Sequence, residues 1–476
     1  MAAMSRTRPT TSVPPNPGTA RVWPVLLASC VGQFLVVLDV SVVNVALPGI
    51  RDDLDLSAAG LQWVVNAYAL TFAGFLLLGG RASDLFGRKP VYLAGLGLFT
   101  ASSLAGGLAG GGGALIAART AQGVGAAVLA PVTLSLITAT LPEGRARTRA
   151  IAAWTATGAA GGAAGGLIGG ALTDWASWRW VLLINVPVGL LVGALVLVAL
   201  REPGNGRAAR PALDLPGAAL VTGGVAALAY GITGTETAGW SSPETLVPLL
   251  GGPVALAAFV AVEARGRDPL MPPRLFRVRS VAVGNLITLI AMTGSFAMWY
   301  FLTLYMQNVL GYSAVETGLA FLPHTAGVIT GSQLAPALMA RFGGRSMVVA
   351  GGVLMAAGFL WQGAVLAEGG GYVATVALPA LPMAAGVGLM LTPLTETATA
   401  GAPPADAGAV AGLINTSRQI GAVLGLSLLS AAATSGTPAE GYARAFLAGG
   451  VLIATSLLLV PLLPPRTRPG GPGGCG

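Results

Sequence analysis

Long apolar stretches follow one another along almost the whole chain, separated by short polar segments. A membrane-spanning helix needs about 20 mostly apolar residues, and most of these stretches reach that length. The first stretch is far longer than the core of a signal peptide, so it is predicted to be a span. The pattern predicts fourteen spans: 23–47, 61–80, 90–110, 113–135, 150–171, 180–200, 215–234, 246–264, 280–303, 314–338, 346–366, 372–394, 406–430 and 444–463.

The composition agrees with an all-α polytopic membrane protein. Charged residues make up 9% of the chain, whereas a soluble domain carries about 25%. A chain of 476 residues with so few charges requires lipid to cover much of its surface. The 70 glycines are roughly double the usual share, which favours close packing of helices in a bilayer.

Basic residues indicate the topology, because cytoplasmic loops of membrane proteins carry an excess of Lys and Arg. Of the 26 basic residues, 21 lie in the N-terminal tail and in every second loop after it, ending with the C-terminal tail. The intervening loops hold only Arg51, Arg179 and Arg444. Both termini are therefore predicted to be cytoplasmic. The rule does not separate twelve spans from fourteen, but the uncharged run 215–234 favours fourteen.

The loops after spans 2 and 10 resemble each other. They read Leu85-Phe86-Gly87-Arg88-Lys89 and Arg341-Phe342-Gly343-Gly344-Arg345. This repeat predicts two related six-helix halves with a binding site between them. The predicted organisation is a disordered cytoplasmic tail (1–22), an N-terminal half (23–200), a linker with two inserted membrane helices (201–279), a C-terminal half (280–463) and a second cytoplasmic tail (464–476).

The segment from Gly80 to Lys89 resembles the signature between spans 2 and 3 of the major facilitator superfamily, although Leu85 replaces a basic residue. Further segments resemble signatures of its fourteen-span drug:proton antiporters. These are Leu38–Pro48 in span 1, Gln62–Tyr68 in span 2, Arg119–Gly125 in span 4, Trp178–Trp180 with Asn185–Gly189 at span 6, and Asn415–Gln419 in span 13. The resemblance runs in order along nearly the whole chain and implies the major facilitator fold.

The resemblance assigns a conformational switch to the first signature. Asp84 is expected to pair with a nearby Arg or a helix N-terminus in one state. Gly80 and Gly87 are expected to permit a tight hairpin, and Arg88 and Lys89 complete the switch. The alternative is an ordinary positively charged loop.

Span 5 departs from the antiporter signature, because Gly166 stands where a proline is expected. Glycines 161, 165, 169 and 170 still permit close helix contact on one face. The missing proline weakens any link between this segment and the direction of export.

Asp39 and Arg119 are ionisable residues inside spans, and such residues mark function by default. Counting 1.5 Å per residue places Asp39 roughly 24 Å above the cytoplasmic face and Arg119 about 21 Å above it. The matching depths predict that the two residues form a proton-coupling pair, with a purely structural ion pair as the alternative.

Two further polar residues lie inside spans. An unperturbed histidine has a pKa near 6.5, which suits a proton relay for His324, with a structural, hydrogen-bonded histidine as the alternative. Arg418 either takes part in the relay or binds helix carbonyls. Polar and aromatic residues are expected to line the substrate cavity, although packing roles are the alternative for most of them: Asn44, Asn66, Tyr68, Phe296, Trp299, Tyr300 and Asn415.

The sequence therefore favours a proton-coupled exporter of small amphiphilic or aromatic drugs in a bacterial plasma (inner) membrane. Its expected partners are the substrate, protons and membrane lipids, with no nucleic acid and no cofactor. Export of an endogenous metabolite or lipid fits the same residues, as does sodium coupling. A polytopic membrane enzyme fits less well, because the loops are short and the chain holds one histidine.

Overall fold

The computed structural model describes residues 22–141, 144–199, 214–266, 271, 273–399, 407–434 and 436–463. All regular structure within these ranges is helical, as the apolar pattern predicted. The two predicted tails lie outside the described residues, apart from Val22, and so does the start of the linker before Asp214.

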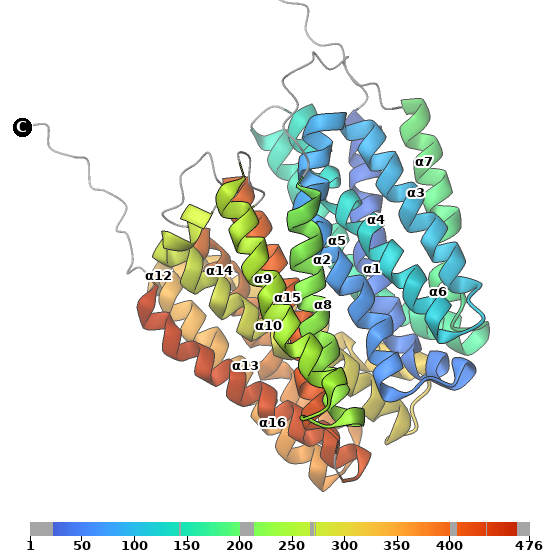
Figure 1. The fold of residues 1–476 in the computed structure, drawn as a ribbon, viewed down its shortest axis with the longest axis vertical. Coiled ribbons are helices and arrows are strands. Elements are labelled where there is room, and N and C mark those ends of the chain that lie inside the picture. Colours follow the sequence, from blue (N-terminus) through green and yellow to red (C-terminus); the bar gives the residue numbers. More distant parts are fainter. Residues whose placement is uncertain are drawn as a thin grey trace, which may run out of the picture.

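The N-terminal half forms a bundle of long helices (Figure 1). A break at Ile184 divides the predicted sixth span into two helices. In chain order the helices are α1 (Val22–Leu54), α2 (Ala58–Phe86), α3 (Arg88–Gly107), α4 (Gly112–Thr140), α5 (Arg145–Trp175), α6 (Trp180–Leu183) and α7 (Asn185–Ala199).

The C-terminal half stands beside the N-terminal half (Figure 1). The linker holds α8 (Leu215–Ala238), α9 (Pro243–Arg265) and the short η1 (Pro273–Arg277). Of the two linker helices, α8 contacts both halves and α9 packs against α8. The C-terminal half comprises α10 (Arg279–Asn308), α11 (Ala314–Ala320), α12 (Leu322–Phe342), α13 (Gly344–Glu368), the π-helical η2 (Val373–Ala377), α14 (Leu378–Thr399), α15 (Ala407–Ala432), α16 (Pro438–Ser456) and η4 (Leu457–Leu462).

Ten helical segments among the described residues are long and apolar enough to cross a membrane, and α8 and α9 are among them. The other four predicted spans fall on α3, on α5, on α11 and α12 together, and on α15, all of which are helical as well. The many Gly and Ala residues of α5 add little hydrophobicity, although they let neighbouring helices pack closely against it.

The sequence repeat has a structural counterpart. Gly87 ends α2 with φ 92° and ψ 152°, and Gly343 ends α12 with φ 88° and ψ 153°. Only glycine adopts such positive φ angles readily, so both tight hairpins depend on it. Corresponding helices also pack alike, since α3 lies against α4 as α13 lies against α14. We call the end of the bundle that holds these two turns the inner end, and the opposite end the outer end.

The sequence predicted that the glycines of α5 lie on one face of the helix, but they are divided between two neighbouring helices, α1 and α11. A Cβ added at Gly161 or Gly169 would lie within 3 Å of α1 backbone atoms. Gly166 and Gly170 face α11 in the other half, and a Cβ added at Gly318 of α11 would lie 2.2 Å from the Gly166 carbonyl oxygen. Gly318 and Gly170 therefore allow the two halves to touch, whereas a Cβ at Gly166, in the position where proline was expected, would make an ordinary contact at 3.4 Å.

The linker helix α8 contacts both halves. It packs against α2 on one side and α15 on the other (Figure 1). A Cβ added at Gly74 of α2 would lie 1.7 Å from the Thr222 hydroxyl of α8, so the two helices approach closely at this point. Val423 of α15 belongs to the same apolar cluster as Val225 of α8 and Leu70 of α2.

Candidate functional site

Asp39 and Arg119 meet inside the N-terminal half. Asp39 projects from α1 with 0% of its surface exposed, and Arg119 projects from α4 with 2% exposed. Arg119 Nη1 lies 2.5 Å from Asp39 Oδ2. Removing two charges from water costs several kcal/mol each, and only close pairing with further hydrogen bonds offsets that cost.

Three neighbouring polar side chains supply those hydrogen bonds. Gln122 Nε2 donates to Asp39 Oδ1 at 2.7 Å, and Asn185 Nδ2 of α7 donates to the same oxygen at 3.0 Å. Ser103 Oγ of α3 accepts from Gln122 Nε2 at 2.7 Å. The carboxylate of Asp39 is therefore held by donors from two other helices of the same half, α4 and α7.

Sequence reasoning missed these three side chains as members of the cluster. Gln122 follows Arg119 by three residues, which places both on one face of α4. Asn185 opens a segment already singled out near span 6. These two could have been found from their spacing, whereas Ser103 carries no signal beyond being a polar residue in a span.

Arg119 has partners besides Asp39. Its Nε donates to the Val64 carbonyl oxygen of α2 at 3.1 Å, and its Nη1 also donates to Gln122 Oε1 at 2.7 Å. The guanidinium lies over the Tyr68 ring, with 4.3 Å from Cζ to the ring centroid. Contact with an aromatic face stabilises a desolvated cation.

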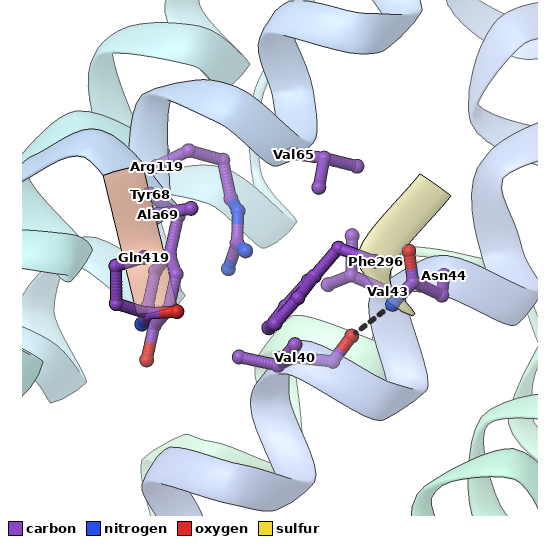
Figure 2. Close-up of a pocket in the computed structure, with 9 residues that line it drawn as sticks. All are labelled: Val40, Val43, Asn44, Val65, Tyr68, Ala69, Arg119, Phe296 and Gln419. Atoms are coloured by element: carbon purple, nitrogen blue, oxygen red, sulfur yellow. Dashed lines mark hydrogen bonds between the residues drawn. The ribbon is translucent and has the colours of Figure 1, made fainter. Parts of the chain in front are cut away.

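A small cavity borders Arg119, and Asp39 is not among the residues that line it. Figure 2 shows the Arg119 guanidinium and the Phe296 ring of α10 pointing into this space, with Tyr68 and Gln419 beside it. The cavity measures about 10 Å³, which is room for about one water molecule. Because its lining comes from both halves, Arg119 lies between the Asp39 carboxylate and the interface of the halves.

A larger cavity of about 230 Å³ lies between α5 of the N-terminal half and helices of the C-terminal half. Side chains of α5, α10, α12, α13 and α14 line it, and Trp299 and His324 are among them. The rings of these two residues meet edge to face, with centroids 5.4 Å apart.

The seven residues expected in one substrate cavity lie in different places. Asn44, Tyr68 and Phe296 line the small cavity, and Trp299 lines the large one. The remaining three have other surroundings: Asn66 donates to Ser427 Oγ at 3.2 Å, Tyr300 packs against Phe301, and Asn415 is exposed on α15. The single cavity expected from the sequence is thus two.

The two further relay candidates are not among the side chains that contact Asp39 or Arg119 in the described residues. Arg418 Nη2 donates to Thr395 Oγ1 of α14 at 2.9 Å. His324 lines the large cavity. Both belong to the C-terminal half.

The segment from Gly80 to Lys89 forms the expected hairpin at the inner end. Arg88 Nε donates to Ser135 Oγ at 2.8 Å, and Lys89 Nζ donates to the Leu197 carbonyl oxygen at 2.8 Å. The expectation for Gly80 is wrong, because an added Cβ would only touch Pro131 at an ordinary 3.8 Å. Gly79 has the close contact instead, 2.3 Å from the Ala127 carbonyl oxygen. The side chain of Asp84 lies outside what the structure describes.

A carboxylate joins the two halves at the outer end. Asp174, near the end of α5, accepts hydrogen bonds from the Ala314 and Val315 backbone N–H groups at 3.1 and 2.9 Å. These are the first two residues of α11, whose N-terminal amides have no partner within the helix. Ser313 caps the third amide, that of Glu316, at 3.2 Å. Two backbone N–H groups at the N-terminus of α11 are therefore hydrogen-bonded by a residue of the other half.

Comparisons with known proteins agree on the family. The profile described as Major Facilitator Superfamily matches residues 29–426. The chain is 44% identical to a cephamycin export protein of Amycolatopsis lactamdurans, covering 94% of each chain. It is 38% identical to a puromycin resistance protein of Streptomyces alboniger, covering 94% of this chain and 92% of that one. A crystal structure of a bacterial homologue of the lysosomal transporter Spinster shares the fold, with a TM-score of 0.66, 18% identity, and coverage of 92% and 97%.

Proposed function

Because the chain belongs to the Major Facilitator Superfamily of membrane transporters, we propose that it exports small amphiphilic or aromatic antibiotics in exchange for protons. The names of the two relatives, cephamycin export and puromycin resistance, support this class of substrate. The proposal includes fourteen spans and cytoplasmic termini in a bacterial plasma membrane, as the basic loops indicate.

The observation that carries the proposal is the position of Asp39 behind Arg119. An ionisable pair inside a membrane protein is costly and commonly marks an ion or proton path. Asp39 is fully buried, and Arg119 separates it from the cavity between the halves. A proton from that cavity reaches Asp39 only when the guanidinium moves aside.

Protonation of Asp39 changes the balance of contacts in this cluster. The neutral carboxyl loses its charge-assisted bond to Arg119, and such bonds are roughly twice as strong as neutral ones. Gln122 and Asn185 keep Asp39 Oδ1 as an acceptor, so the carboxyl group stays in place. The guanidinium, which already lies over the Tyr68 ring and lines the cavity, is then free to leave the carboxylate and move farther into the cavity, toward Phe296. Proton binding is thereby linked to the interface of the two halves.

The contacts at the outer end support an inward-facing state. Asp174 and the α5–α11 glycines hold the halves together there. Gln307 of α10 also donates to the Val45 carbonyl oxygen of α1 at 2.9 Å. Outward opening must break these contacts. The proton gradient supplies the work, since each proton carries about 2.3 kcal/mol per 100 mV and about 1.36 kcal/mol per pH unit.

The test is proton movement in proteoliposomes when puromycin is added. The Asp39→Asn variant resembles the protonated state permanently, so proton-driven export should disappear while puromycin still binds. Asp53→Asn is the matched control, because Asp53 pairs with Arg179 at the outer end at 2.9 Å, away from the cavity. If Asp39→Asn exchanges protons for puromycin at the wild-type rate, Asp39 is not the proton carrier.

A further inference from the structure

We infer that Asp214 and Glu263 form a further proton-binding site in the linker, in which the two carboxyl groups hold one proton between them. The site lies where α8 begins and α9 ends, and it is separate from Asp39. The inference goes beyond the proposed function, because proton binding here needs no transported molecule.

Each of the two carboxyl groups has one oxygen bonded to the backbone and one oxygen left over. Asp214 caps α8, and its Oδ1 accepts from the Gly217 N–H at 2.9 Å. Glu263 Oε2 accepts from the Met271 N–H at 2.9 Å, in the segment that follows α9. The remaining oxygens, Asp214 Oδ2 and Glu263 Oε1, converge, because a Cβ added at Gly217 would lie within 3 Å of both.

The remaining oxygen of Glu263 lacks a donor. Glu263 is 2% exposed, and none of the described residues donates a hydrogen bond to its Oε1. A charged Asp214 cannot supply one, because a carboxylate only accepts. Two carboxylates that face each other closely do not both keep their charge, and a buried acceptor without a partner is costly. One proton removes both penalties, since Glu263 Oε1–H then donates to Asp214 Oδ2.

The surroundings of the two residues place the proton on Glu263. Asp214 lies at the N-terminus of α8, where the helix dipole favours a negative charge. Phe259, one turn before Glu263 on α9, and Met271 belong to one apolar cluster. Apolar surroundings disfavour a charged carboxylate. The arrangement is therefore a neutral Glu263 that donates to a charged Asp214.

The charged groups around Glu263 come from three other elements. Helix α9 packs against α8, which contributes Asp214, and against η1, which contributes the exposed Arg274 and Arg277. The Arg81 guanidinium of α2 is near enough to attract the Glu263 carboxylate. With one proton, the carboxyl pair carries a single negative charge, which the charge of Arg81 balances. Without that proton, the pair carries two negative charges.

Loss of the proton should loosen the linker. The hydrogen bond between α9 and the start of α8 disappears, and the two carboxylates then repel each other. Arg81 belongs to the hairpin segment Gly80–Lys89, so the site lies toward the inner end and faces the cytoplasm in the proposed topology. Since α8 contacts both α2 and α15, the site sets how firmly the linker joins the halves. This contact is complete at low cytoplasmic pH and is lost as the pH rises.

Infrared difference spectroscopy tests for the shared proton directly. A protonated carboxyl group has a carbonyl stretching band that a carboxylate lacks. At neutral pH, the wild-type spectrum minus that of Glu263→Gln should contain this band, and the band should disappear at alkaline pH. Glu316→Gln is the matched control, because the exposed Glu316 also accepts a backbone N–H, that of Ser313 at 2.8 Å. Its difference spectrum should contain carboxylate bands only.

Spin labels report the effect on the linker. In a background with Cys30→Ser and Cys475→Ser, labels replace Ala219 of α8 and Val260 of α9, which are both exposed. Their dipolar coupling is measured in nanodiscs without any gradient or substrate. Raising the pH should lower the ratio of close to separated label pairs about two- to tenfold in the wild type, the range for one hydrogen bond.

Two variants should remove this response to pH. Glu263→Gln keeps the acceptor for Met271 and donates to Asp214 through Nε2, so its coupling should stay at the acid value of the wild type. Asp214→Asn keeps the cap on Gly217 and donates to Glu263 through Nδ2, with the same result. The inference is overturned if the infrared band is absent, if Glu316→Gln removes the same band, or if wild type and Glu263→Gln respond equally to pH.

These measurements also separate the inference from the proposed function. Asp39→Asn should keep both the infrared band of Glu263 and the response of the labels to pH, because Asp39 is not part of this site. Antiport of puromycin in a protein without the band would refute only the linker site. The band in a protein that exchanges no protons for puromycin would refute only the antiport proposal.

Discussion

Replacing Asp174 with Ala should shift the transporter toward its outward-open state. Asp174 accepts two backbone hydrogen bonds from α11 across the interface of the halves, at 3.1 and 2.9 Å. These bonds exist only while the outer end is closed, so their loss destabilises the closed state alone. Loss of a capping side chain costs typically about 1 kcal/mol. Because Asp174 is exposed to solvent, we use that typical value and expect about a fivefold change in the ratio of states.

Ser313 provides the matched control for this prediction. Its hydroxyl caps the same helix at 3.2 Å, and Ser313→Ala removes a comparable bond. Both Ser313 and α11 belong to the C-terminal half, so this bond is present in both states. Ser313→Ala should lower overall stability by a similar amount and leave the ratio of states unchanged.

The ratio can be measured with spin labels at the outer end. Labels replacing Leu108 in the N-terminal half and Val373 in the C-terminal half occupy exposed positions, 68% and 61% exposed. Pulsed electron-spin distances between them should divide into a short and a long population, and Asp174→Ala should enrich the long one about fivefold. If Asp174→Ala and Ser313→Ala change the ratio equally, or if neither changes it, Asp174 does not hold the outer end closed.

Further predictions concern the glycine contact, the inner hairpin and the topology. Gly318→Ala should block closure of the outer end and abolish transport without unfolding the protein, whereas Gly97→Ala, with no atom within 4 Å of the added Cβ, should transport normally; equal transport by both would refute the contact's role. Asp84→Asn should slow puromycin transport several-fold in proteoliposomes with unchanged equilibrium binding, and a large loss of binding in a folded variant would contradict its role as a switch. Reporter fusions after Asn205 and Glu368 should give cytoplasmic and external signals respectively, and an external signal at Asn205 would overturn the topology.

Much of the fold could be predicted from the sequence, because burial in lipid imposes strong patterns. Long apolar runs give the helices, and glycine at positions 87 and 343 gives both inner turns. The depth of Asp39 and Arg119 could be counted along their helices, since the rise per residue is fixed. Such rules act along one helix at a time.

The remaining features depend on how helices rotate against each other, which no linear pattern specifies. The spacing in the sequence predicted that the glycines of α5 lie on one face of the helix, but some of them contact α1 and others contact α11. Phe296 and Trp299 are three residues apart, yet they line different cavities because α10 stands between those cavities. Asp174 looked like an ordinary polar residue at a helix end, because its partners are backbone groups about 140 residues away. Contacts to a distant backbone leave no residue-type signal.

The linker helices have a mechanical consequence. Because α8 packs against both α2 and α15, the two halves are joined along that edge of the bundle. The edge formed by α5 and α11 has no such inserted helix and is held by backbone contacts and the Asp174 carboxylate. In the proposed transport cycle, we expect rotation of one half against the other to have its axis near α8 and its largest displacement near α5. For the proposed exporter, we therefore expect a lipophilic substrate dissolved in the bilayer to enter the protein along α5 and not along the α8 edge.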